Sequence, residues 1–362
     1  MTNGKAGLSV FCYTVLMKKK LISLCAFAAV LAAGAGTDKD ELPALLTQVK
    51  STFDGSLQPC YFYAPEKAKT EAVPLVVGLH TWSGTWANVN SYEPSYAYAK
   101  AHEWAMVGPN FRGRNDHPEA CGGEAAVQDI VDAVEYAKRT VKIDATRVYI
   151  IGGSGGGHMT LLMAGRHPEI WAGCVAFCPI TDLARWHADS LLDHPGRGAG
   201  YAKMMEGACG GTPPDRADEY RRRSPLTWLD RAKAAGVPVY IATGIHDGWK
   251  GSVPVGHAFR AYNLLAQEAD RVSEADIAAI ETDQKVPATL TREGDGDPFY
   301  PASMRIHFRR TSGNVRMTLF EGGHAGNYPA GFDFLSRQVK GRPADFALPK
   351  SVEDAKQEAL SR

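Results

Sequence analysis

Residues 149–162 read YIIGGSGGGHMTLL and place five glycines around one serine, between an apolar run and a segment with helical spacing. A phosphate-binding P-loop needs a lysine and then a serine or threonine after its last glycine, but His158 and Met159 stand there. A dinucleotide-binding fingerprint that starts at Gly153 needs its third glycine at position 158, which is also a histidine. A flexible linker does not fit flanks that are apolar on both sides. We therefore expect the glycines to shape a turn around the serine and not to bind a phosphate.

The pentapeptide Gly152-Gly153-Ser154-Gly155-Gly156 matches the pattern G-x-S-x-G between an expected strand and an expected helix. In that pattern the serine lies on a tight, strained turn, and glycines on both sides avoid clashes within the turn. The amide N–H of Gly155 and the start of the helix then face the position where negative charge develops on a carbonyl oxygen. This context predicts that Ser154 is a catalytic nucleophile.

A serine hydroxyl becomes a good nucleophile only when a base takes its proton, and the base needs an acid to orient it. In a sheet of this class the acid and the histidine follow the serine along the chain, each on a loop after a later strand. Asp247 follows the apolar run 237–243, and His324 follows the run 315–320 between glycines. We therefore predict a Ser154–Asp247–His324 triad. The other acids and histidines after Ser154 are weaker candidates by location: Asp295, Asp297, His246, His257 and His307.

The loop after residues 75–80, with the sequence LHTWSGTW, is the expected source of a second oxyanion donor. The candidates are the backbone N–H groups of Thr81 and Trp82. Three further tryptophans fall on segments that should border the site, and their rings could stack on sugar rings or aromatic acyl groups. They are Trp86, Trp186 and Trp249. Ordinary packing under loops is the alternative for each of them.

Short apolar runs alternate with segments of helical spacing, which predicts an α/β fold with a mainly parallel sheet and helices on both faces. The expected strands are residues 60–63, 75–80, 105–109, 148–152, 173–178, 237–243 and 315–320. The expected helices are residues 91–101, 123–138, 155–165, 255–266 and a segment near 330–339. Residues 181–236 interrupt this rhythm, and we expect a cap-like insertion that forms a pocket wall. A surface excursion without a function is the alternative.

The N-terminal 35 residues predict a secretory signal peptide. Lysines at positions 18–20 precede the apolar run 21–33, and small residues allow cleavage after Ala35. The start at residue 1 reads as over-long, with Met17 as the expected initiator. Lipidation at Cys25 is disfavoured by the large Leu24 before it, and the apolar run is short for a membrane span. We expect a secreted or periplasmic protein whose residues 36–362 form a single domain with no membrane span.

The formal net charge is zero, which does not predict capture of nucleic acid or of an anionic membrane. Five cysteines remain after the expected cleavage, so at most two disulfides and at least one free thiol are expected. They are Cys60, Cys121, Cys174, Cys178 and Cys209. No cysteine pair has zinc-type spacing with nearby histidines, and we predict neither a metal nor an organic cofactor.

Together these segments resemble the α/β-hydrolase fold, and specifically the catalytic domain of prolyl-oligopeptidase-like serine hydrolases. The matching motifs lie within residues 59–340 and are LHTWSG, PNFRG, GGSGGGHMTLLMAGRHPEIWAG, HDGWKGSVP and FEGGH. The same single-domain layout is similar to that of secreted polysaccharide-deacylating and feruloyl-type esterases. The resemblance implies an acyl-enzyme mechanism on a Ser–His–Asp set.

Three departures from that family pattern favour an esterase over a peptidase. Thr81 and Trp82 replace the double glycine usual in the oxyanion loop. Gly155 stands where the peptidases often have a tyrosine, and we expect its missing side chain to open the pocket beside the serine. The short stretch between the expected cleavage and the first strand leaves no room for the N-terminal propeller of the oligopeptidases.

We therefore expect hydrolysis of carboxylic esters on carbohydrate or plant-derived substrates, with a small-molecule or oligosaccharide ester as the partner. An exopeptidase acting on short peptides is the second hypothesis, and it would need a charged anchor for the free N-terminus of the peptide. A non-catalytic binding protein that kept the fold is the third. The sequence does not indicate an oligomeric state.

Overall fold

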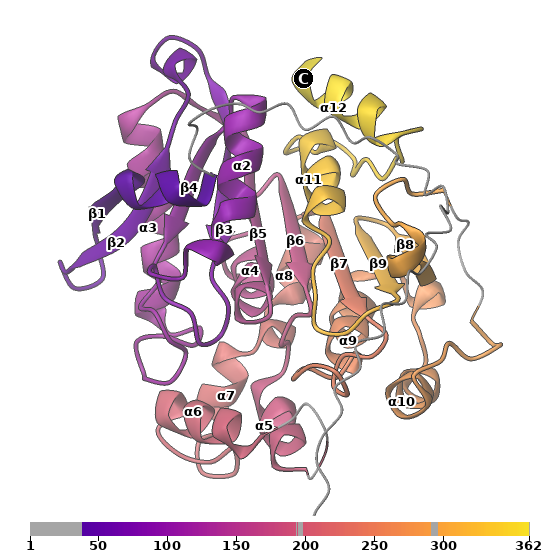
Figure 1. Cartoon of the computed structure of the whole chain (residues 1–362). Coiled ribbons are helices and arrows are strands. Elements are labelled where there is room, and N and C mark those ends of the chain that lie inside the picture. Colours follow the sequence, from indigo (N-terminus) through magenta and orange to yellow (C-terminus); the bar gives the residue numbers. More distant parts are fainter. Residues whose placement is uncertain (1–37, 193, 195–197, 291–295, 362) are drawn as a thin grey trace, which may run out of the picture. The chain divides into compact units, whose positions relative to one another are not determined.

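The structure, a computed structural model, describes residues 38–192, 194, 198–290 and 296–361. The predicted signal peptide, Met17 and Cys25 lie outside these residues. A nine-stranded sheet in the order β1-β2-β4-β3-β5-β6-β7-β9-β8 forms the centre of the described part (Figure 1). The strands are β1 (Leu46–Lys50), β2 (Leu57–Tyr63), β3 (Val73–Leu79), β4 (Ala105–Pro109), β5 (Ile143–Gly153), β6 (Gly173–Phe177), β7 (Val239–Gly244), β8 (Ile306–Ser312) and β9 (Val315–Phe320).

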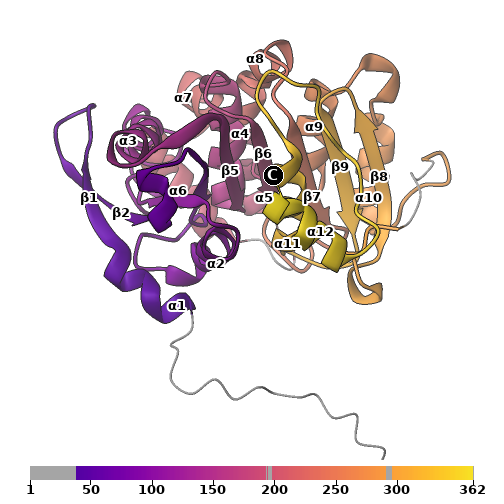
Figure 2. The same ribbon diagram turned by 90° about the horizontal axis from the view of Figure 1, so that it is seen from above.

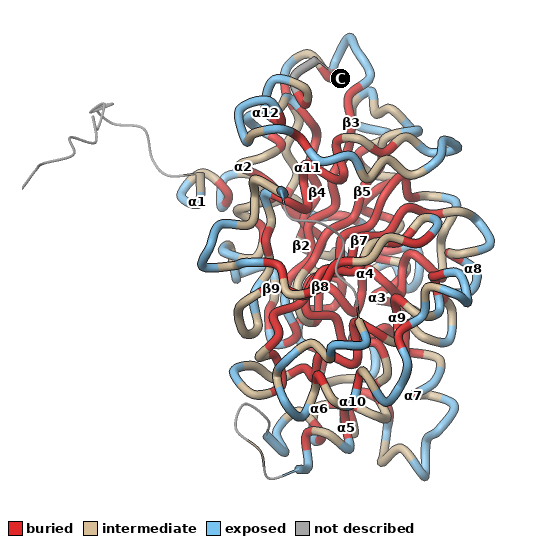
Figure 3. Tube along the Cα trace, turned by 90° about the vertical axis from the view of Figure 1, so that its right-hand side faces the viewer, coloured by how far each residue is buried: buried red, intermediate tan, exposed pale blue. Residues whose placement is uncertain are grey.

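The centre of the sheet is parallel and its edges are antiparallel. Neighbouring strands from β4 through β3, β5, β6 and β7 to β9 pair in parallel. The β1–β2, β2–β4 and β8–β9 pairs are antiparallel. Because the central strands are covered on both faces, β3, β4, β6 and β7 are buried along their length and β5 is buried in its second half, as the red core of the tube in Figure 3 shows.

Helices cover both faces of the sheet, as the view along it in Figure 2 shows. One face carries α2 (Glu93–His102), α11 (Tyr328–Arg337) and α12 (Val352–Ser361), and the other carries α3 (Glu124–Thr140), α4 (Gly155–Arg166), α8 (Leu229–Ala234) and α9 (Gly256–Leu265). The remaining helices are α1 (Asp38–Glu41), α5 (Leu183–Leu191), α6 (Ala199–Cys209), α7 (Ala217–Arg223) and α10 (Glu274–Asp283). This layering is the α/β-hydrolase arrangement that the sequence predicts.

All seven strands and five helices expected from the sequence are present, with small shifts at their ends. The sequence missed β1 and β8, which lie at the two edges of the sheet. Their sequences, LTQVK and IHFRRTS, are rich in polar and charged residues, as is common where an edge strand faces solvent. An apolar run is therefore a good signal for a central strand and a poor one for an edge strand.

The predicted insertion at residues 181–236 consists of two parts. Helices α5, α6 and α7 pack together beyond the ends at which β6 and β7 terminate (Figure 1). Helix α8 instead packs against α4 and α9 and belongs to the layer on the sheet. The cap-like part therefore ends near Arg223.

The five cysteines of the described residues are all free and buried. Burial raises the pKa of Cys60 to about 12 and the pKa of Cys209 to about 11. Thiols in such surroundings react slowly because the thiolate is the reactive form. No helix among the described residues combines the length and the apolar character that a bilayer span requires.

Arg112, from the PNFRG motif, connects its own loop after β4 with the β1–β2 turn and with helix α3. Its backbone has a φ of 71°, and its side chain is only 4% exposed. Its guanidinium donates to both carboxylate oxygens of Asp129 on α3, at 2.8 and 3.2 Å, and to Asp54 in the β1–β2 turn at 2.7 Å. The motif thus has a structural task, because it ties the β1–β2 hairpin to α3.

We expect Arg112→Ala to lower the free energy of unfolding by about 3–5 kcal/mol, because the buried Asp129 carboxylate would lose its counter-charge. Arg112→Lys should restore little, since an ammonium group cannot make the forked contact. Chemical denaturation measures the effect. Arg114→Ala is the matched control, because Arg114 forms an exposed pair with Asp116 that should contribute about 0–1 kcal/mol. Equal stability of the two alanine variants would contradict the proposed task of Arg112.

Candidate active site

Ser154 lies on a strained turn between β5 and α4. Its φ of 58° and ψ of −119° lie outside the regions that side-chain-bearing residues normally adopt. The Ser154 N–H donates to Phe177 O at 2.8 Å, and the Ser154 carbonyl accepts from His158 N at 2.8 Å. These bonds hold the turn between the end of β6 and the first turn of α4. Strain of this kind is typical of functional residues that the surrounding structure holds in place.

The glycines around Ser154 are required by close backbone contacts. A Cβ on Gly152 would lie 2.5 Å from the carbonyl carbon of Gly156, which closes the turn on itself. A Cβ on Gly156 would lie 2.9 Å from the carbonyl oxygens of Leu79 and His80. The turn that carries Ser154 therefore packs backbone to backbone against the loop that follows β3.

Gly155 makes the closest of these approaches to the oxyanion loop. A Cβ on Gly155 would lie 2.4 Å from both N and Cα of Trp82. The expectation that Gly155 opens a pocket beside the serine is therefore wrong, because the backbone of Trp82 fills the space. The described residues contain no hydrogen-bond partner for the backbone N–H of Gly155 or of Trp82. Two adjacent unpaired amide donors are what an oxyanion site requires.

Asp247 and His324 form a direct hydrogen bond after β7 and β9. His324 Nδ1 donates to Asp247 Oδ2 at 2.8 Å, and the Asp247 side chain is fully buried. Asp247 Oδ1 accepts from the backbone N–H of Gly248 at 2.9 Å and of Val253 at 3.2 Å. These donors stabilise the carboxylate, which fixes the His324 proton on Nδ1 and leaves Nε2 free to accept one.

Ser154 and His324 line one small pocket of about 130 Å³. Within the described residues, Ser154 Oγ makes no hydrogen bond to His324, a separation common in ligand-free sites that tighten on substrate. The pocket also contains Thr81 of the oxyanion loop. Its remaining walls come from the ends of β5 and β6 and from the segment after His324: Gly153, Phe177, Cys178, Ala325, Gly326 and Tyr328.

Electrostatics at His324 favour its protonated form. Burial opposes protonation, but the sulfur of Cys178 and the carboxylate of Asp247 outweigh burial and raise the pKa of His324 above its ordinary value. The cause is physical proximity of negative or electron-rich groups to an imidazole in a half-buried site. His324 is therefore a stronger base than a solvent-exposed histidine.

The tryptophans predicted to contact substrate do not line the Ser154 pocket. Trp186 is 1% exposed, with its ring 4.7 Å from that of Trp82 and its Nε1 donating to Ser252 O, so it is a packing residue of the insertion. Trp249 donates to Glu281 O on α10 and contacts His194. Trp86 is 37% exposed on the oxyanion loop. The alternative of ordinary packing is therefore correct for Trp186.

Sequence reasoning missed Phe177, Cys178 and Tyr328 as pocket residues. Phe177 and Cys178 were expected only as part of the strand 173–178, with Cys178 also one of five thiols, and Tyr328 was not singled out. For Phe177 and Cys178 the sequence did contain a usable signal, which is their position at the end of an expected strand. Phe177 ends β6 and Cys178 directly follows it, much as Asp247 follows β7. Side chains at the carboxyl ends of parallel strands gather at one edge of the sheet.

Glu321 joins the two loops that carry Asp247 and His324. It accepts from His246 Nε2 at 2.9 Å and from His307 Nε2 at 2.8 Å. His246 precedes Asp247, and Glu321 lies three residues before His324. A bond from His307 lowers the pKa of Glu321, with a second contribution from His246. The three side chains therefore tie β8 and the acid loop to the histidine loop.

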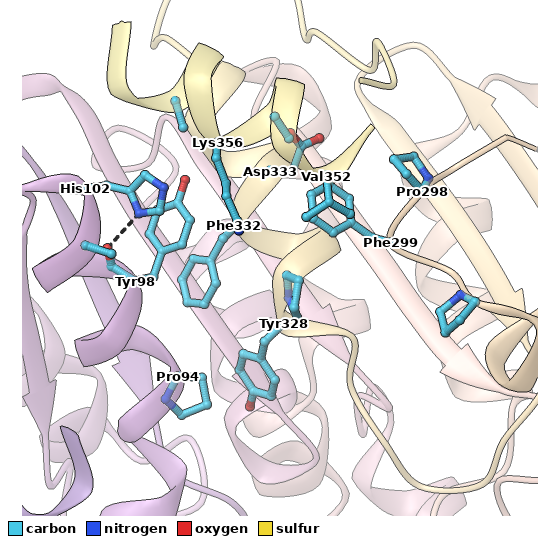
Figure 4. A pocket seen from close by; sticks show the side chains of 15 residues that line it. Pro94, Tyr98, His102, Pro298, Phe299, Tyr328, Phe332, Asp333, Val352 and Lys356 are labelled. Atoms are coloured by element: carbon cyan, nitrogen blue, oxygen red, sulfur yellow. Dashed lines mark hydrogen bonds between the residues drawn. The ribbon is translucent and has the colours of Figure 1, made fainter. Parts of the chain in front are cut away.

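A larger apolar groove of about 610 Å³ lies between α2, α11 and α12 (Figure 4). Tyr98 and Phe332 stack across it at 4.4 Å between ring centroids. Neither Ser154 nor His324 lines it, and Tyr328 is the residue that it shares with the Ser154 pocket. The small pocket, not the large groove, contains the predicted chemical groups.

The described residues hold one group of His, Cys, Asp or Glu side chains close enough together to bind a metal ion. Its members are Cys178, Asp247 and His324. The acyl-transfer chemistry that Ser154, His324 and Asp247 can perform requires no metal.

The chain matches the model of the prolyl oligopeptidase family over residues 92–281, just over half of its 362 residues. Feruloyl esterase B of Neurospora crassa is 32% identical over 126 residues, covering 32% of this chain and 42% of the esterase. Dipeptidyl aminopeptidase BIII of Pseudoxanthomonas mexicana is 30% identical over 190 residues, covering 48% of this chain and 25% of the peptidase.

Among solved structures, the acylaminoacyl peptidase of Pyrococcus horikoshii has a TM-score of 0.55 to this chain at 16% identity. The likeness covers 86% of this chain and 43% of that protein, and it shows a shared fold. The chain spans less than half the length of each of these three proteins. From the family match and the fold around Ser154, the chain belongs to the prolyl oligopeptidase family, whose members are α/β-hydrolase-fold serine hydrolases.

Proposed function

We propose that this protein is a secreted esterase that hydrolyses carboxylic esters through an acyl-enzyme on Ser154. The observation that carries the proposal is the arrangement around Ser154. This serine lies on a strained turn beside the unpaired amides of Gly155 and Trp82, and it lines one pocket with the Asp-oriented His324. In acyl transfer the serine is the nucleophile, the amides bind the oxyanion and the histidine moves the proton. The likeness to a feruloyl esterase supports an ester as the substrate.

The mechanism follows from the tautomer of His324. Nε2 takes the Ser154 proton as Oγ attacks the ester carbonyl, and the N–H groups of Gly155 and Trp82 bind the oxyanion. The imidazolium then gives its proton to the leaving alcohol, which leaves an acyl-enzyme. Water attacks this acyl-enzyme with His324 again as the base. Asp247 stabilises the imidazolium in both halves.

The chemistry of the pocket supports an ester over a peptide with a free N-terminus. The residues that line the Ser154 pocket include no Asp or Glu side chain, so a substrate ammonium group would find no counter-charge there. Phe177 and Tyr328 offer aromatic surface, which suits a phenolic or acetylated carbohydrate ester. An exopeptidase is the second candidate, because a dipeptidyl aminopeptidase aligns with nearly half of the chain.

The N-terminal part of the proposal rests on the sequence. Residues 1–35, which lie outside the described residues, are proposed as a signal peptide that directs secretion or periplasmic export. Residues 36–362 are proposed as a single catalytic domain. N-terminal sequencing of the exported protein should find a new terminus after Ala35.

The function is tested by a substrate panel combined with labelling of the serine. We expect a fluorophosphonate probe to label the wild-type protein and not Ser154→Ala, and Ser154→Ala to lose turnover of p-nitrophenyl acetate by about five to six orders of magnitude. Feruloylated and acetylated sugars should be hydrolysed faster than aminoacyl-naphthylamides. Faster cleavage of the naphthylamides would favour the peptidase, and no labelling would favour a non-catalytic binder.

The raised pKa of His324 predicts where activity is lost in acid. Protonated His324 cannot accept the serine proton, so kcat/KM should fall as pH drops through a pKa that lies above the ordinary value of about 6.5. Asp247→Asn should move this fall to lower pH and reduce kcat by about 10⁴-fold. Asp144→Asn, on the surface of β5, is the control and should change neither. A fall centred below pH 6.5 in the wild-type protein would contradict the prediction.

Substitution of Gly155 tests whether the Trp82 amide is an oxyanion donor. The methyl group of Gly155→Ala would lie 2.4 Å from Trp82 N, so the loop must move away and one donor is misplaced. We expect kcat for p-nitrophenyl acetate to fall by about 10²–10³-fold while the circular dichroism spectrum is preserved. Gly200→Ala is the matched control, because no atom lies within 4 Å of its added Cβ. Full activity of Gly155→Ala would mean that the Trp82 amide is not a donor.

A further inference from the structure

Cys178 brings a third metal-binding atom to the pair formed by Asp247 and His324. Its sulfur, a carboxylate oxygen of Asp247 and a ring nitrogen of His324 all lie within 4.8 Å of one another. Thiolate sulfur, imidazole nitrogen and carboxylate oxygen are the three ligand types that proteins use for Zn²⁺. The three residues come from the ends of β6, β7 and β9, so the sheet itself sets their spacing.

The backbone of Cys178 is held in an unusual conformation at this position. Its φ is 45°, a left-handed value that is uncommon for residues with a side chain. The Cys178 N–H donates to Ala242 O at 2.9 Å, which anchors the residue to β7. The residue is buried and lines the Ser154 pocket together with His324.

A second layer of contacts surrounds the three donors. Thr243 Oγ1 lies 3.6 Å from Cys178 Sγ and 3.5 Å from Asp247 Oδ2. The Cys178 thiol donates to Ala325 O at 3.1 Å, next to His324 in the chain. Such outer contacts orient metal ligands in known sites. The proposed acyl transfer on Ser154 assigns no bond-making or proton-transfer step to Cys178 itself.

We propose that Cys178, Asp247 and His324 form an inhibitory Zn²⁺ site that blocks the esterase reversibly. Binding forms a zinc–sulfur bond while the thiol proton leaves to solvent, and any proton on the coordinating ring nitrogen of His324 leaves to solvent as well. A ring nitrogen of His324 and a carboxylate oxygen of Asp247 supply two further bonds, and water takes the fourth position. His324 can then no longer accept the proton of Ser154. Ca²⁺ and Mg²⁺ do not compete, because they prefer oxygen ligands.

The first test measures binding without catalysis. The full chain carrying Ser154→Ala is titrated with ZnCl₂ against a chromogenic zinc indicator, alone and combined with Cys178→Ala. We expect stoichiometric competition with the indicator and at least about tenfold weaker binding when Cys178 is replaced. Cys174→Ala is the matched control, since Cys174 is equally buried on β6 and is not part of the cluster. Unchanged zinc affinity in the Cys178→Ala protein would overturn the proposal.

The second test measures inhibition and rests on the proposed function. Zn²⁺ should inhibit p-nitrophenyl acetate hydrolysis by the wild-type protein, and EDTA should restore it. The inhibition constant of Cys178→Ala, relative to its own zinc-free activity, should be at least about tenfold higher, whereas that of Cys174→Ala should not change. Equal inhibition constants in all three proteins would overturn the zinc site. A protein that binds zinc in the first test but hydrolyses no ester would refute the proposed function alone.

Discussion

The close packing of backbone against backbone at Ser154 is the constraint on which the rest of the site depends. Gly152 lies against Gly156, and Gly155 lies against the N and Cα of Trp82. Only residues without a Cβ permit these approaches, so the turn at Ser154 and the loop after β3, the proposed nucleophile turn and oxyanion loop, form one unit. The strained φ of Ser154 follows, because the turn must reverse direction between β5 and α4 within one residue.

The ends of three later strands complete the site around that turn. The Asp247–His324 bond joins the loops after β7 and β9, and Glu321 reinforces this junction through His246 and His307. Asp247 lies three residues after β7 and His324 four residues after β9, so both groups stay close to the ends of buried strands. The same geometry places the Cys178 sulfur beside both groups, where it adds the third ligand of the proposed zinc site to the proposed catalytic pair.

Two expectations from the sequence failed for the same physical reason. The missing side chain of Gly155 predicted an open pocket, and Trp186 was expected to border the site, with ordinary packing as the alternative. Each inference assumed solvent beside a residue, but the backbone of Trp82 and the packed insertion fill the respective positions. Whether a small residue opens a cavity or admits a neighbour depends on segments distant in the chain, and the sequence around the residue does not contain that information.

The sequence by itself determined the central strands and the strand–turn–helix around Ser154, and it predicted the order of nucleophile, acid and histidine. These features depend on local patterns, because apolar runs, helical spacing and glycine positions act over a few residues. The tertiary structure decided the Asp247–His324 contact, the tight approach of Trp82 to Gly155, and the cluster that includes Cys178. Asp247 and His324 are 77 residues apart, and their contact exists because parallel strands end at one edge of the sheet. Distances across that edge are a property of the packed sheet.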